Sequence, residues 1–329
     1  MSDIESRGAG LRLAVLTLLL VGCGCAQAQV AWRPERTVEL VVYSAAGGGN
    51  DKSARVLDRI WKESKLADAV VVNKVGGGGN IAFTYIGQKP GDAHFVAIAQ
   101  SALVTNQITG LSSIRYNDFT PLAFVGSEPA ALAVRADSPY RNVKELLAQL
   151  RKDPQSLSFS VGSTRGATNH ISLGLLAKAA GIDAKQLKVV VFGGGALSMS
   201  NLLGGHIDAV VMAANNSIPH HAAGTVRILG LSAPDRSPAL PDVPTFREEG
   251  YDATLEGWTV VVGPKGLSAA QAGFWEGVLQ KSTNHDEWKN YLAQNAWRWG
   301  YRNSRDTAAY LDQYYERSRL LLTEIGMAR

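Results

Sequence analysis

The residues that could do chemistry in this sequence are gathered in six loops, and nearly all of their side chains are neutral. Taken together, the loops are rich in glycine, alanine, Ser, Thr, Asn and Gln, and they cover residues 44–50, 76–80, 100–101, 162–168, 193–195 and 213–216. Backbone N–H groups in glycine loops that lead into helices bind anions, and Ser, Thr and Asn add neutral donors and acceptors. Only Arg165 in these loops is cationic. We therefore expect an organic carboxylate to be held mainly by directed hydrogen bonds.

The residues expected to bind the ligand come from these loops and from one position directly after the first of them. They are Ser44, Gly47, Gly48, Gly49, Asn50, Asp51, Gly79, Asn80, Ser101, Ser163, Thr164, Arg165, Gly166, Thr168, Gly193, Gly194, Asn215 and Asn216. Asp51 is interpreted as an N-cap or first-turn acid that holds the first loop in place, so its contribution to binding is indirect. Arg165 either pairs with a second carboxylate of the ligand or is a solvated loop residue.

Other chemistries lack their motifs. The first loop has lysine at position 52, where the dinucleotide-binding fingerprint requires a third glycine, and the run 76–79 is not followed by Lys-Ser or Lys-Thr. The six histidines show no His-Glu-x-x-His spacing, and the serine of the segment 162–166 stands one place too early for a nucleophile elbow. Taken singly, each glycine loop could also be only a tight turn. We predict a binding protein that is not an enzyme and holds no cofactor or metal.

The elements that must position these loops repeat one pattern, in which an apolar run rich in strand formers precedes each loop and a helical pattern follows several of them. The expected strands cover residues 38–43, 70–72, 95–99, 157–161, 189–192, 207–212 and 256–262, and further helices are expected at 143–150, 269–281 and 307–325. This alternation predicts an α/β protein built of mainly parallel sheets flanked by helices. Ligands of such sheets bind beyond the carboxyl ends of the strands, where all six loops are expected.

The chain of 329 residues is long enough for two domains. We expect residues 29–127 together with 252–329 to form domain 1 and residues 128–251 to form domain 2, with the ligand cleft between them. The strand expected at 256–262 would cross back to domain 1. The net charge of +4 includes no block of like charges, so a nucleic-acid partner is not expected, and the protein is expected to be a monomer.

The N-terminus predicts export. Arg7 and Arg12 supply a positive flank, residues 11–21 are almost entirely apolar, and the small-residue cleavage site Ala26-Gln27-Ala28 follows. Residues 1–28 are therefore interpreted as a signal peptide and the mature protein as periplasmic. The residues that end in Cys23 also form a lipobox, and a lipoprotein anchored through Cys23 is the second choice. Cleavage after residue 28 removes both cysteines of the chain, which excludes disulfides and thiol chemistry.

Several motifs resemble those of the extracytoplasmic receptors of tripartite tricarboxylate transporters, the Bug family. The similarity extends over nearly the whole mature chain and is carried by residues 47–55, 73–80, 163–170, 202–208 and 236–245. It implies the two-domain periplasmic-binding-protein, or Venus flytrap, fold. It also implies capture of a tricarboxylate, dicarboxylate or related acid by amides, hydroxyls and waters, with His170 at the site and membrane permease subunits as partners. Ala45 and Ala46 replace the prolines that are usual before the first glycines, and Arg165 replaces a usually uncharged residue.

Three functions remain open at this point. The protein is a receptor that feeds a transporter, a solute sensor for a signalling partner, or an enzyme on the same scaffold, because a fold does not fix a function.

Overall fold

The computed structural model describes residues 32–162, 165–192 and 194–329. The predicted signal peptide and both cysteines lie outside these residues. A search of the described helices finds none that is long and apolar enough to cross a membrane.

A first group of elements is built around three parallel strands. Strand β1 (Val38–Val42) pairs on one side with β2 (Ala69–Asn73) and on the other with β3 (Phe95–Ala99). Each strand leads through its loop into a helix: α2 (Gly49–Glu63), α3 (Asn80–Gly87) and α4 (Ala102–Ile108). All five residues of β3 are buried, as expected for a strand that other elements cover on both faces.

A second group repeats the arrangement. Strand β5 (Ser158–Ser160) lies parallel to β6 (Lys188–Val190) and to β7 (Ala209–Ala213), and β8 (Val226–Leu231) completes the set. The helices are α5 (Val143–Lys152), α6 (Thr168–Ala179), α7 (Gly195–Leu203) and the short α8 (Ile218–Ala222). Helix α5 begins as predicted after Asn142, whose side chain accepts a hydrogen bond from the Glu145 N–H at 2.9 Å.

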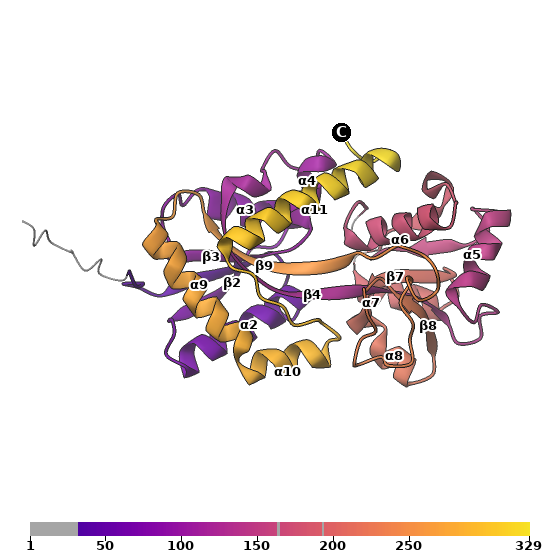
Figure 1. The fold of residues 1–329 in the computed structure, drawn as a ribbon, viewed down its shortest axis with the longest axis horizontal. Coiled ribbons are helices and arrows are strands. Elements are labelled where there is room, and N and C mark those ends of the chain that lie inside the picture. The colour runs from indigo at the N-terminus through magenta and orange to yellow at the C-terminus, as the bar shows by residue number, and fades with distance from the viewer. Residues whose placement is uncertain (1–31, 163–164, 193) are drawn as a thin grey trace, which may run out of the picture. The chain divides into compact units, whose positions relative to one another are not determined.

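Two long strands connect the groups (Figure 1). Strand β4 (Phe119–Arg135) pairs with β9 (Glu256–Pro264) up to Pro129, and from Ala130 onward it pairs with β7 and β8. The strand order is β2-β1-β3-β9-β4-β7-β5-β6, with β8 also on β4. Antiparallel pairing enters wherever β4 or β9 takes part, so the sheets are mixed. The predicted domain boundary between residues 127 and 128 falls inside β4.

The C-terminal helices are α9 (Ala269–Asn284), α10 (Asp286–Gln294) and α11 (Ser304–Glu324), and they include the two helices predicted at 269–281 and 307–325. Of these, α9 and α10 pack on the first group, while α11 packs on α4 of the first group and on α6 of the second. The rings of Trp61 in α2 and Trp275 in α9 lie 5.2 Å apart, and both side chains are fully buried. The Trp61 indole N–H donates to Ser282 Oγ at 2.8 Å, so the buried polar atom is paired. The described residues also form four short 3₁₀ turns: η1 (Gly77–Gly79), η2 (Tyr116–Asp118), η3 (Ala184–Gln186) and η4 (Ala214–Asn216).

Candidate functional site

The six predicted loops meet at one cavity of ≈ 720 Å³. Its wall takes described residues from every loop of both groups, and β4 and β9 add Glu128, Pro129, Gly257 and Trp258. The cavity therefore lies at the carboxyl ends of the strands that precede the loops, where ligands of such sheets bind.

The predicted site residues divide into three sets. Seven line the cavity: Ser44, Gly48, Gly49, Gly79, Ser101, Thr168 and Gly194. Nine do not line it: Gly47, Asn50, Asp51, Asn80, Arg165, Gly166, His170, Asn215 and Asn216. The other three, Ser163, Thr164 and Gly193, lie outside the described residues.

Within the described part of the chain, four helices of eight or more residues begin at the cavity with an N-cap residue that supplies no capping side chain, although in α2 Ser44 Oγ accepts from the Asp51 N–H at 3.1 Å. The N-cap residues of α2, α3, α6 and α7 are Gly48, Gly79, Ala167 and Gly194, and all four line the cavity. Glycine and alanine have no side-chain oxygen that could accept from the first N–H groups of a helix. By contrast, α5, α9, α10 and α11 begin elsewhere and are capped by Asn, Ser or His side chains. The cavity thus has the positive ends of four helix dipoles at its wall.

Asp51 holds the first loop from behind the cavity. Its carboxylate is almost fully buried and accepts from the Gly47 N–H at 2.8 Å and from Asn73 Nδ2 at 2.9 Å. Arg55 adds two further bonds at 2.9 and 3.0 Å. The bond from Arg55, with help from Gly47 and Asn73, lowers the pKa of Asp51 to about 2. These contacts are those of a first-turn acid that positions the loop, which is the indirect role expected from the sequence.

The second loop consists of glycines because its backbone has positive φ angles. Gly76 to Gly79 have φ angles of 130°, 59°, 63° and 104°, a run of values that L side chains rarely adopt. A Cβ on Gly79 would also stand 2.8 Å from the ring of Phe83. Asn106 in α4 holds the loop, because its Nδ2 donates to the Gly78 carbonyl at 3.0 Å. Asn106 also lines the cavity, although it was not predicted from the sequence.

His170 supports the fourth loop rather than the cavity wall. Its Nδ1 accepts from the Gly166 N–H at 3.0 Å, which requires a ring that is unprotonated at this nitrogen. Burial, assisted by the charge of Arg165, lowers the pKa of His170 to about 4. Thr168, which does line the cavity, is joined by its hydroxyl to the buried hydroxyl of Tyr314 in α11 at 3.1 Å.

None of the asparagines expected at the site lines the cavity. Asn80 donates to the Leu111 carbonyl at 2.9 Å, and Asn50 is buried within the first turn of α2. Asn216 donates to the side chain of Asn215 at 3.0 Å and to the Ala213 carbonyl at 3.3 Å.

Arg165 lies on the outside of its loop. Its guanidinium donates to the Val189 carbonyl at 2.6 Å, its side chain is exposed, and it does not line the cavity. Of the two roles considered for Arg165, this position favours the loop residue.

We therefore expect Arg165→Ala to change ligand affinity by less than about tenfold, or ~1.4 kcal/mol. The reason is that the substitution removes only an exposed hydrogen bond to the backbone. Isothermal titration of the variant with the acid that binds the native protein checks this. A loss of about a thousandfold would mean instead that an ion pair to Arg165 holds the ligand.

Further polar side chains of the wall, among them Tyr43, Gln100 and Glu128, were not among the predicted site residues, although Gln100 stands in a predicted loop. Tyr43 follows β1 directly, and its hydroxyl donates to Gln100 Oε1 at 2.9 Å. Gln100 in turn donates to Thr259 Oγ1 at 3.3 Å, which links the third loop to β9. Glu128 lies inside β4, away from any predicted loop, and it is the only acidic side chain among the described residues that line the cavity. No Lys, Arg or His occurs among those residues.

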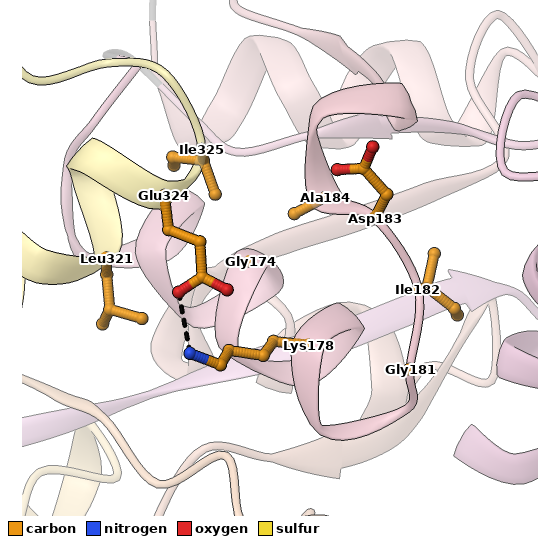
Figure 2. A pocket seen from close by; sticks show the side chains of 9 residues that line it. All are labelled: Gly174, Lys178, Gly181, Ile182, Asp183, Ala184, Leu321, Glu324 and Ile325. Atoms are coloured by element: carbon orange, nitrogen blue, oxygen red, sulfur yellow. Dashed lines mark hydrogen bonds and ion pairs between the residues drawn. The ribbon is translucent and has the colours of Figure 1, made fainter.

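A smaller cavity of ≈ 280 Å³ lies elsewhere, between α6, the turn η3 and the end of α11 (Figure 2). Lys178 and Glu324 close one side of it with an ion pair of 2.7 Å. No predicted site residue lines it. Across the described part of the chain, no group of three or more His, Cys, Asp or Glu side chains is arranged to hold a metal ion.

Comparison with known proteins places the chain among bacterial receptors. The model of the family described as "Tripartite tricarboxylate transporter family receptor" matches residues 54–327. A Pseudomonas protein, the UPF0065 protein in the tcbD-tcbE intergenic region, is 30% identical over 80% of this chain and 79% of its own length. The solved periplasmic binding protein BugD is 26% identical, with a TM-score of 0.76 over 90% of this chain and 99% of that one. Rpa4515 of R. palustris, solved with adipate, is 25% identical, with a TM-score of 0.79 over 90% and 99%. The periplasmic-binding-protein fold predicted from the sequence is thereby confirmed.

Proposed function

Since the chain belongs to the tripartite tricarboxylate transporter receptor family, we propose that it is an extracytoplasmic receptor that captures a small organic carboxylate, of the dicarboxylate or tricarboxylate type, in the ≈ 720 Å³ cavity. The loaded receptor delivers the acid to the membrane permease subunits of a tripartite transporter. It performs no reaction on the acid.

The observation that carries this proposal is the set of four helices that begin at the cavity with glycine or alanine as N-cap. Their first N–H groups have no cap from these residues, and the dipoles of the helices favour negative charge at the same place. Because the described wall contains no cationic side chain, a carboxylate there is bound by hydrogen bonds from the backbone and from neutral side chains. The adipate bound by the relative Rpa4515 is an acid of this class.

Native mass spectrometry of the protein freshly purified from its own host tests the proposal. We expect a co-purified acid at one equivalent, which titration calorimetry then confirms with the pure compound. A protein that carries no acid and binds no member of a panel of dicarboxylates, tricarboxylates and amino acids would contradict it.

We also propose that the ligand bridges two domains, residues 29–127 with 252–329 and residues 128–251, and that binding draws them together. The support is that the cavity wall takes residues from both groups of elements and from β4 and β9, which connect them.

Saturating ligand should therefore reduce the radius of gyration measured by small-angle X-ray scattering, because closure excludes water from the cavity. The dimethyl ester of the same acid is the control, since it lacks the charge that the helix termini stabilise. An unchanged radius of gyration with the bound acid would contradict domain closure.

A further inference from the structure

Glu128 is a carboxyl group in a cavity whose other features favour anions. Among the described residues of the wall it is the only Asp, Glu, Lys, Arg or His side chain, so no cation of the wall balances its negative charge when it is ionised. A receptor for simple carboxylates gains nothing from a negative charge at this place, because like charges repel strongly where water is scarce.

The structure holds the Glu128 side chain at the cavity through its partner on the neighbouring strand. Glu128 pairs in register with Gly257 of β9, which also lines the cavity. A Cβ on residue 257 would stand 3.0 Å from Glu128 Cγ and 3.3 Å from Oε1. The absence of a side chain at Gly257 therefore leaves the space that the Glu128 side chain occupies.

The carboxyl group of Glu128 has no hydrogen bond or ion pair with any other described residue. The Trp297 indole N–H is close enough to favour the charged form of the Glu128 carboxyl group, yet the two groups do not have the geometry of a hydrogen bond. The nearby Tyr43 hydroxyl donates to Gln100 rather than to Glu128. A partly buried carboxylate without a partner is costly, so its free oxygens favour a partner that the ligand supplies.

We propose that Glu128 pairs with a protonated amino group of the ligand and thereby selects an amino carboxylate over the same acid without the amine. This inference rests on the proposed carboxylate capture and specifies it. The helix termini bind the carboxylate part of the ligand, while Glu128 binds its cationic part. A buried charge pair of this kind changes affinity by about tenfold or more when one partner is removed.

The pairing should depend on pH in a defined direction. Burial raises the pKa of Glu128 to about 7, so the group gains its charge as the pH rises through neutrality. Other titratable groups that face it are Tyr43 and Tyr291, and burial raises the pKa of both hydroxyls, which keeps them neutral over this range. The preference for the amine-bearing acid should therefore increase from pH 6 to pH 8.

The test compares matched acids by titration calorimetry: succinate with L-aspartate and β-alanine, and glutarate with L-glutamate and 4-aminobutyrate. We expect the tightest ligand of each set to carry the amine. In Glu128→Gln its affinity should fall by about tenfold or more, whereas the amine-free acid should bind equally well or better. Glu63→Gln, which removes an exposed carboxylate at the end of α2, is the matched control and should keep the native preference.

Each outcome has a defined meaning. If the acids bind but the amine-free member is preferred, or if the amine preference survives in Glu128→Gln, the role of Glu128 is wrong while carboxylate capture stands. If no acid binds, carboxylate capture and the inference both fail. Should Glu128→Gln not fold, the pH dependence of the native protein decides, and a flat preference between pH 6 and pH 8 overturns the inference.

Discussion

Replacing Asp51 by Asn should weaken ligand binding by about tenfold or more, although Asp51 does not line the cavity. The substitution leaves the size of the side chain unchanged. It replaces a carboxylate, whose two oxygens accept hydrogen bonds from Gly47, Asn73 and Arg55, by an amide with one accepting oxygen and one donating NH₂ group. An amide N–H would then face donors in a buried site, and the first loop would lose its position. We also expect the free energy of unfolding to fall by about 1–3 kcal/mol.

Titration calorimetry and chemical denaturation of the same preparation measure both effects. Asp286→Asn is the control, because Asp286 is also a first-turn acid, but its side chain is 94% exposed. That variant should differ from the native protein by less than about 0.5 kcal/mol in stability. Native affinity in Asp51→Asn would show that the loop keeps its geometry without the carboxylate.

Acid should reproduce part of the effect of Asp51→Asn. The pKa of Asp51 is about 2 in the folded protein, below the ordinary value of 3.8. A group whose pKa is lowered on folding stabilises the protein above its unfolded value, and that contribution is lost as the pH falls from about 4 toward 2.

The second large effect is expected for Gly194→Ala, which should weaken binding by about tenfold or more with little change in thermal stability. Gly194 is the N-cap of α7 and has φ 141° and ψ −178°, a conformation that is essentially restricted to glycine. A Cβ there would meet no atom within 4 Å, so the substitution acts through backbone strain rather than through a clash. Relief of the strain turns the first N–H groups of α7 away from the cavity.

Gly250→Ala is the control for strain alone. Gly250 has φ 94° and does not line the cavity. As at Gly194, a Cβ at this position would meet no atom within 4 Å. It should lower stability by ~1 kcal/mol and leave affinity unchanged. Equal losses of affinity in both variants would mean that Gly194 has no specific part in recognition.

The positions of the loops could be predicted because strands and glycine turns leave local signals. Apolar runs such as residues 95–99 mark buried strands, and glycines in series mark turns that precede helices. The parallel pairing within each group then brings the loops to one edge. The same logic failed for side-chain direction: Asn80 and Arg165 stand in the correct loops but bond to backbone carbonyls outside the cavity wall. Sequence spacing does not report which way a loop side chain turns.

Glu128 could not be found by this reasoning because it does not follow a strand. It lies within β4, where Gly126 and the residues around it shift the pairing register with β9. Only the pairing of β4 with β9, between segments more than 100 residues apart, brings Glu128 to the cavity. The sequence shows only that Glu128 is an acidic residue within a mainly apolar segment. Its position at the cavity follows from its pairing with Gly257 of β9, which the sequence does not reveal.

The four helices whose N-cap residues supply no capping side chain have a thermodynamic consequence. In most proteins a helix carries its own cap, so its stability does not depend on other molecules. Here a single bound anion would complete α2, α3, α6 and α7 together, and these helices belong to both groups of elements. The free energy of unfolding then depends on the concentration of the solute. Above the dissociation constant, every tenfold rise in free ligand adds about 1.4 kcal/mol to the free energy of unfolding. If the protein binds an acid as proposed, it should by this linkage resist proteolysis better with saturating ligand than without it.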